Sequence, residues 1–142
     1  MRIRDVMTSE VKTIDPGASP EAARELMDRA RIHHLVVAKG KTVLGVISSR
    51  DVQTDGAGAM VGDVMNGKCV TAAPDLPLKK AANLLRGRSI GCLPVVEDGR
   101  LVGIVTLADL LELVGRGVNP SLGGRLDRAP HKKVSRLARA VS

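Results

Sequence analysis

The chain has 142 residues, and its hydrophobic content of 44% excludes general disorder. No apolar run approaches the roughly 18 residues that would cross a bilayer, and the segment MRIRDVMTSE lacks the apolar core of a secretory signal, so we expect a cytoplasmic protein without a membrane span. Most of the net charge of +7 lies in residues 115–142, which carry seven basic side chains and one acidic one. Residues 1–114 are nearly neutral, with 15 basic and 14 acidic side chains, so the overall charge says little about the partners of this body.

The first predicted elements are a short extended segment at residues 11–14 and a helix. Ser19 offers an N-cap for this helix, and Pro20 suits its first position. The segment SPEAARELMDRAR then places an apolar stripe along one helix face: Ala22, Ala23, Leu26, Met27 and Ala30.

A predicted hairpin and a second helix come next. The apolar run LVVA at 35–38 is typical of a buried strand, and Lys39-Gly40 is a weak turn signal before the return strand TVLGVIS at 42–48. The second helix begins at the hydroxyl residue Ser48 and is short, because the glycine-rich residues 56–59 break it.

The same series of elements is predicted again in the second half. Pro77 opens a helix, and the strand LPVV at 93–96 leads through Asp98-Gly99, a strong hairpin signal, into the return strand at 100–106. The last helix runs to Gly115. The first of these two helices repeats the apolar stripe: Leu78, Ala81, Ala82 and Leu85.

These two halves are a sequence repeat. A shift of 58 residues aligns residues 5–52 with 63–110 without a gap and gives 12 identities in 48 positions, against about three expected by chance. Each unit therefore reads β-α-β-β-α, and the fold class is α/β (α+β). Because a unit of about 50 residues buries too little apolar surface to be secure alone, we expect the two repeats to pack sheet to sheet around one core, as a pseudo-twofold body. The expected divisions are repeat 1 at 1–57, repeat 2 at 58–114 and a basic tail at 115–142.

One phrase occurs in both repeats, as GVISSRDV at 45–52 and GIVTLADL at 103–110. The glycine lets another backbone approach the strand closely. The hydroxyl residue can cap the helix and leave free backbone N–H groups that suit a phosphate, and the aspartate three residues later can accept hydrogen bonds from a ribose diol. The alternative is structural, a capping box with an acidic residue in the first helical turn. The residues concerned are Gly45, Ser48 and Asp51 in repeat 1 and Gly103, Thr106 and Asp109 in repeat 2.

The repeats resemble a known family. DVM at 5–7 and 63–65, and the stretch GCLPVVEDGRLVGIVTLADLL at 91–111, are similar to a tandem pair of cystathionine β-synthase (CBS) domains, called a Bateman module. The resemblance covers residues 4–114. It implies two repeats packed as a pseudo-dimer, a further homodimer in the form of a disc, and clefts between the repeats that bind AMP, ADP, ATP, S-adenosylmethionine or NAD.

The resemblance also implies roles for particular residues. Asp51 and Asp109 would contact ribose, and Ser48 and Thr106 would contact phosphate or ribose. The backbone at two places would frame the base and phosphates: Ile32, His33 and His34, and Ile90, Gly91 and Cys92. The leading segments would each close the opposite repeat's cleft: Val6, Met7 and Thr8, and Val64, Met65 and Asn66. Pro94 matches the family's Leu-Pro-Val-Val, whereas Val36 departs from it, so we expect related but unequal clefts.

The unequal clefts predict different ligands. His34, with Lys39, Lys41 and Arg50 nearby in sequence, could reach phosphates in the first cleft, while the second has no obvious cation and would take an uncharged tail or stay empty. Alternatively, the two histidines are strand-entry residues satisfied locally. Since adjacent strand residues point to opposite faces, His33 and His34 are not expected to share a metal ion.

Other chemistry is not predicted. The two cysteines, Cys69 and Cys92, form neither a disulfide framework nor a zinc pattern and are expected to be buried small residues. There is no Phe, Tyr or Trp, which excludes aromatic stacking platforms for single-stranded nucleic acid. Without a P-loop, a GxGxxG motif or a nucleophile elbow, we expect no catalysis and no required cofactor.

The basic tail leaves the repeat pattern. After Pro130, HKKVSRLARAVS could form a short basic helix, with Val134, Leu137 and Val141 on its apolar side. It could be a solvated or partner-packed terminus, or it could contact nucleic acid, an acidic partner or a membrane surface. The main hypothesis is therefore a sensor of adenosine-containing ligands that signals to an unidentified regulated protein. The alternative is a protein- or nucleic-acid-interaction module that uses the tail, with unoccupied clefts.

Overall fold

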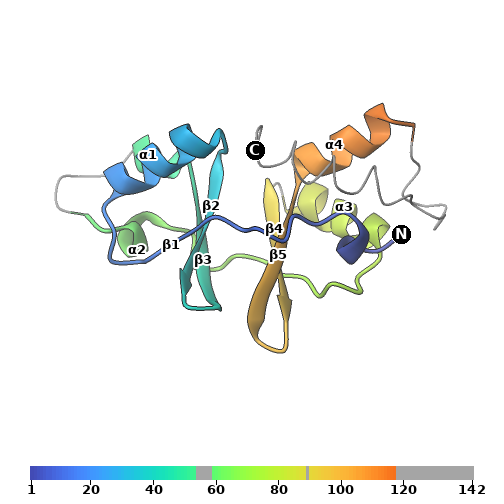
Figure 1. The fold of residues 1–142 in the computed structure, drawn as a ribbon, viewed down its shortest axis with the longest axis horizontal. Helices are drawn as coiled ribbons and strands as arrows, with labels where there is room; N and C mark the ends of the chain where they lie inside the picture. The colour runs from blue at the N-terminus through green and yellow to red at the C-terminus, as the bar shows by residue number, and fades with distance from the viewer. Residues whose placement is uncertain (54–58, 89, 118–142) are drawn as a thin grey trace.

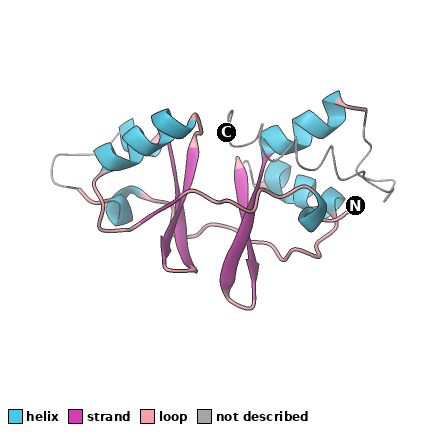
Figure 2. Ribbon diagram, viewed as in Figure 1, coloured by secondary structure: helices cyan, strands magenta, loops and turns pink. Residues whose placement is uncertain are grey.

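The computed structural model describes residues 1–53, 59–88 and 90–117, and it contains two hairpins side by side with helices on their outer flanks (Figures 1 and 2). The residues 54–58 and most of the tail, including the predicted basic helix, lie outside the described residues. The elements of repeat 1 are η1 (Ile3–Asp5), β1 (Thr13–Ile14), α1 (Pro20–Ala30), β2 (His34–Lys39), β3 (Thr42–Ser48) and η2 (Asp51–Gln53). Those of repeat 2 are α2 (Val61–Val64), α3 (Leu78–Gly87), β4 (Cys92–Glu97), β5 (Arg100–Thr106) and α4 (Leu107–Gly115). No described helix is long and apolar enough to cross a membrane.

Helix α1 begins and ends at the predicted places. The Ser19 hydroxyl accepts a hydrogen bond from the amide of Ala22 at 3.0 Å, which is the expected N-cap. Of the predicted apolar stripe, Ala23 and Met27 are buried, but Ala22 is exposed because it lies at the edge of the stripe in the first turn. The helix ends at Arg31 in a left-handed conformation (φ 57°), and the amide of Ile32 donates to the Met27 carbonyl at 3.0 Å. This is a Schellman ending, normally made by glycine.

The two hairpins have the same register. β2 pairs with β3 and β4 with β5, and both are antiparallel with an irregularity at the same place in the repeat, Val37/Ala38 and Val95/Val96. Asp98 and Gly99 both have positive φ, as the predicted turn requires. The first turn lies one residue later than predicted, since Lys39 still pairs with Thr42.

The edge strand differs between the repeats. β1 pairs in parallel with β2, through Ile14 and Val37. Its counterpart in repeat 2 is an isolated bridge between Ala72 and Val95. The β-α-β-β-α order predicted for each unit is thus present in outline, with a reduced first strand in repeat 2. In the described residues of repeat 1, the 3-10 helix η2 stands where a short second helix was predicted to begin at Ser48.

The leading segments of the two repeats are exchanged. Ile3 of η1 lies in the apolar cluster of repeat 2, and its amide donates to the Leu76 carbonyl at 2.9 Å. Val61 of α2 lies in the cluster of repeat 1, and its amide donates to the Ala18 carbonyl at 2.8 Å. These pairs are related by the 58-residue shift, so the exchange is symmetric. It ties each repeat to the other through buried backbone.

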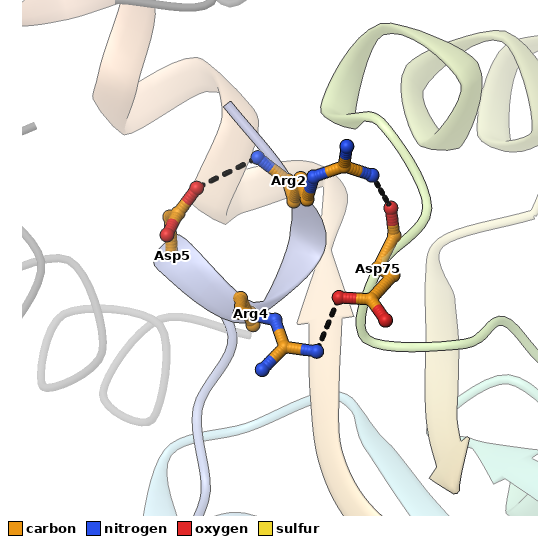
Figure 3. Close-up of polar contacts among 4 residues, drawn as sticks. All are labelled: Arg2, Arg4, Asp5 and Asp75. Atoms are coloured by element: carbon orange, nitrogen blue, oxygen red, sulfur yellow. Dashed lines mark hydrogen bonds and ion pairs between the residues drawn. The ribbon is translucent and has the colours of Figure 1, made fainter. Parts of the chain in front are cut away.

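Polar contacts strengthen one of these exchanges (Figure 3). Arg2 donates to the backbone carbonyl of Asp75, and Arg4 forms an ion pair with the Asp75 carboxylate. The Asp5 carboxylate accepts a hydrogen bond from the Arg2 amide at 2.7 Å. The start of the chain is thereby held against repeat 2.

The expectation of one continuous core is wrong. Each repeat has its own apolar cluster on the helix side of its sheet, and a third, small cluster joins the repeats. Alternation along β2 explains this, because Leu35 and Val37 face the helices whereas Val36 and Ala38 face the other repeat with Leu101. The sheets therefore meet over a small area, which leaves room between the repeats.

Candidate ligand-binding site

Both strand–helix junctions form the same hydrogen-bonded ring. At the first junction the Ser48 amide donates to Asp51 Oδ2 at 2.8 Å, and the Asp51 amide donates to Ser48 Oγ at 3.3 Å. At the second, the corresponding distances between Thr106 and Asp109 are 2.8 and 3.2 Å. The capping box that we considered as the structural alternative is thus present in both repeats.

The free backbone amides expected at these junctions are largely occupied. In addition to the capping-box amides, the Ser49 amide donates to the His33 carbonyl, and the Leu107 amide donates to the Gly91 carbonyl, both at 2.9 Å. The expectation overlooked that each cap closes its own ring and that the next amide donates to the residue just before β2 or β4. A phosphate near either junction must therefore rely mainly on side chains.

The two repeated glycines allow the predicted close approach. A Cβ atom on Gly45 would lie 2.6 Å from the Asn66 carbonyl oxygen, and one on Gly103 would lie 2.6 Å from Met7 Sδ. The leading segments pair here with the opposite repeat, through bridges from Asn66 to Val46 and from Thr8 to Ile104. This crossing places Asn66 next to the first junction.

A cavity of about 750 Å³ opens at the first junction, between the two repeats. Its size suits a nucleotide, since small-molecule pockets usually measure about 300–1,000 Å³. Repeat 1 contributes His33, His34, Val46, Ser48, Ser49, Arg50 and Asp51, and repeat 2 contributes Asn66, Lys68, Cys69, Val70, Arg88, Ile90, Gly91 and Cys92. Eight predicted site residues thus meet in one place: Ser48, Asp51, His33, His34, Asn66, Ile90, Gly91 and Cys92.

The cavity has more basic than acidic side chains. Arg50, Lys68 and Arg88 line it together with one carboxylate, that of Asp51. Sequence reasoning named Arg50 but missed Lys68 and Arg88, although each lies two residues from a predicted site residue. By contrast, Lys39 and Lys41 lie at the hairpin turn, at the other end of β2 from His34.

His34 lies between the repeats. A Cβ atom on Gly91 would come within 2.6 Å of His34 Nε2, so the imidazole packs directly over this glycine. Burial, together with the nearby charge of His33, lowers the pKa of His34, against the opposing effect of Asp51. The Nδ1 atom is buried, and within the described ranges no partner reaches it. The ring is therefore mostly neutral near pH 7, and its Nδ1 atom is enclosed by the protein.

The second junction is closed. Asp109 is 0% exposed, and neither it nor Thr106 lines the cavity. Burial raises the pKa of Asp109 to about 7, although the hydrogen bonds from Thr106 act in the opposite direction. Among the residues described, none offers a partner to its Oδ1 atom. The role of Thr106 and Asp109 as ligand contacts stays a prediction.

The other predicted site residues do not line this cavity. Val6, Thr8, Ile32 and Pro94 are buried, and Met7, Val64 and Met65 are half-buried. None of them belongs to the described lining of the 750 Å³ cavity, although Ile32 lines a smaller cavity of about 350 Å³. A direct ligand contact for any of them also stays a prediction.

The two cysteines both line the cavity. Burial raises the pKa of Cys92 to about 12 and also raises the pKa of Cys69, so both thiols are protonated and poorly nucleophilic near pH 7. Cys92 is buried as expected, whereas Cys69 is only partly buried. Across the described part of the chain, no group of three or more His, Cys, Asp or Glu side chains could hold a metal ion.

Comparisons with known proteins agree with this architecture. The family model of the CBS domain matches residues 3–54 and again 61–116. The chain is 30% identical over 138 residues to the CBS domain-containing protein YhcV of Bacillus subtilis, covering 93% of this chain and 97% of that protein. It is also 32% identical to the homoserine O-acetyltransferase of Methanohalobium evestigatum, but it spans only 24% of that enzyme.

Two solved structures with ligands are similar. The CBS domain pair of protein MJ0100, in complex with 5′-methylthioadenosine and S-adenosylmethionine, has a TM-score of 0.77 and 26% identity, over 82% of this chain and 98% of the other. The structure of CBSX2 in complex with AMP has a TM-score of 0.73 and 27% identity, over 81% and 96%. The fold is thus shared with proteins that bind adenosine derivatives.

Proposed function

This chain belongs to the CBS domain family, and from that premise we propose that it is a non-catalytic regulatory module that binds a phosphorylated adenosine ligand in the 750 Å³ cavity. The observation that carries the proposal is the meeting of Asp51 with three basic side chains in one cavity between the repeats. A carboxylate suits the ribose diol, and Arg50, Lys68 and Arg88 suit phosphate oxygens. The ligand complexes of the two similar structures support adenosine as the common part.

A ligand in this cavity would signal through the position of the repeats. The cavity walls come from both repeats, so a ligand that contacts Asp51 and Arg88 at once favours one relative arrangement. Binding can shift the equilibrium only by the difference in affinity between two arrangements. We expect a homodimer and a regulated partner protein to report that shift.

Calorimetric titration tests the proposal directly. AMP, ATP, 5′-methylthioadenosine and S-adenosylmethionine are titrated into the full chain, and Asp51→Asn is expected to weaken adenylate binding about 10- to 100-fold, because it removes a charged hydrogen-bond acceptor. Asp98→Asn is the matched control, since Asp98 lies in the exposed β4–β5 turn and asparagine tolerates its positive φ. Adenylate binding with equal affinity to wild type and Asp51→Asn would refute the site.

The composition provides a second, simpler measurement. Because the chain has no Trp or Tyr, a nucleotide that copurifies with it dominates the absorbance near 260 nm. The basic tail offers another candidate function, in nucleic-acid or protein binding, but most of it lies outside the described residues. Deleting residues 118–142 distinguishes the two, since adenylate binding should persist while any salt-dependent nucleic-acid binding should disappear.

A further inference from the structure

We propose that the ligand site has a second lobe, in which Arg24 and Arg31 hold the distal phosphates of an adenosine polyphosphate. This inference rests on the proposed function and specifies which adenosine ligand the site prefers. A separate cavity of about 350 Å³ lies beside the first one. It is lined by Arg24, Met27, Asp28, Arg31, Ile32, His33, Ser49, Val52 and Gln53.

The two cavities are neighbours. His33 and Ser49 line both of them, and the hydrogen bond from the Ser49 amide to the His33 carbonyl, at 2.9 Å, joins these two residues into the ridge between the lobes. Ser49 also lies directly between Ser48 and Arg50, which line the larger lobe. A chain of phosphates that begins at Arg50 would reach the smaller lobe past these two shared residues.

The smaller lobe is built for an anion. Its charged groups are Arg24, Arg31 and the single carboxylate of Asp28, with His33 on the ridge. Arg24 is oriented by a hydrogen bond from Nη2 to the Val52 carbonyl at 2.9 Å. Since a guanidinium has five N–H donors, this contact positions the group and leaves further donors for a phosphate.

Arg31 occupies a backbone position that ordinarily favours glycine. Its φ of 57° ends α1, where a side chain is disfavoured and glycine is the usual residue. A charged residue in a strained conformation beside a cavity suggests that its side chain has a use there. Repeat 2 provides the contrast, because the positions equivalent to Arg24 and Gln53 are Ala82 and the exposed Leu111.

The test compares ATP with AMP by calorimetry on the full chain. Arg31→Gly removes the cation without straining the backbone, and Arg24→Gln removes the charge of Arg24 at an exposed helix position. Each is expected to weaken ATP binding about 10-fold and to change AMP binding less than 2-fold, as the loss of one charged hydrogen bond predicts. Arg29→Gln is the matched control, because Arg29 is exposed on the same helix and lines neither cavity.

Sodium tripolyphosphate separates this inference from the proposed function. If adenylates do not bind but tripolyphosphate binds in a manner that depends on Arg24 and Arg31, the adenosine assignment fails and the second lobe stands. If AMP and ATP bind equally and neither variant distinguishes them, the second lobe is refuted and the adenosine site stands. Arg31→Gly is also expected to unfold at a higher denaturant concentration, which excludes misfolding as the cause of weaker ATP binding.

Discussion

The junctions at Ser48–Asp51 and Thr106–Asp109 have the same backbone, the same capping hydrogen bonds and opposite environments. Asp51 lines an open cavity, whereas Asp109 is fully buried. Different helices follow the two junctions. After Asp109, helix α4 continues to Gly115, with Leu110 and Leu113 packed into the core. After Asp51, the 3-10 helix η2 ends at Gln53.

The charged side chains around the two junctions have also diverged. The 58-residue shift relates Arg50, Lys68 and Arg88 to Ala108, Glu10 and Ala30. The cavity at the first junction is therefore basic, whereas the positions equivalent to its three cations are uncharged or acidic. The capping hydrogen bonds are symmetric, while the side chains suited to a phosphorylated ligand are concentrated at the first junction.

The largest expected effect concerns the buried carboxylate. The pKa of Asp109 is raised from 3.8 to about 7 in the folded state, so the folded chain binds more protons than the unfolded one. The contribution of protonated Asp109 to the free energy of unfolding is therefore fully present below pH 4. It is lost as the pH rises toward 7, and the loss reaches up to about 4 kcal/mol. The urea concentration at the unfolding midpoint, measured between pH 4 and 8, tests this. It should fall with rising pH in the wild type and fall much less in Asp109→Asn. An equal decline in both proteins would contradict the assignment.

The two close-approach glycines should respond unequally to alanine. A methyl group on Gly45 meets the Asn66 backbone carbonyl, which cannot move away, whereas one on Gly103 first meets the flexible Met7 side chain. We expect a loss of about 2–3 kcal/mol for Gly45→Ala and about 1 kcal/mol for Gly103→Ala. Thermal or urea unfolding at fixed pH compares them. A larger loss of stability for Gly103→Ala than for Gly45→Ala would contradict this prediction.

Replacing two of the cavity's cations by the residues that the 58-residue shift relates to them, Ala108 and Ala30, should remove the phosphate contacts of the first junction. The double variant Arg50→Ala, Arg88→Ala is expected to bind AMP about 30-fold more weakly, while binding of uncharged 5′-methylthioadenosine changes less than 3-fold. Lys79→Ala, Lys80→Ala is a control on exposed residues outside the cavity. Calorimetry with both ligands decides; a parallel loss of both would indicate a damaged cavity rather than a lost phosphate contact.

The smallest expected effect on the free energy of unfolding concerns the left-handed end of helix α1. Because Arg31 has a positive φ, Arg31→Gly should stabilise the chain by about 1 kcal/mol. Arg29→Gly, in the last turn of the same helix, should instead destabilise the chain, by up to about 1 kcal/mol. Urea unfolding of the two variants provides the comparison, and equal midpoints would show that the left-handed ending carries no strain.

Several site features were predictable from local patterns. The spacing of Ser48 and Asp51, and of Thr106 and Asp109, indicated two equivalent junctions, and the hairpin strands were predicted within one residue of their ends. Two of the amides expected to be free, those of Ser49 and Leu107, donate to backbone carbonyls distant in sequence, and no local pattern predicts that contact. Lys68 and Arg88 were missed since they enter the site from the opposite repeat, and no local pattern encodes that contact.

The amino-acid sequence by itself determined the repeat, the order of most elements, the strand bounds to within one residue and the residues of the capping boxes, because these follow from local patterns and from identities between the two halves. Only the tertiary structure decided that the leading segments exchange, that three apolar clusters replace one core, and that Asp51 is accessible while Asp109 is sealed. The physical reason is that the exposure of a residue depends on what packs over it, and packing partners come from parts of the chain that are distant in sequence.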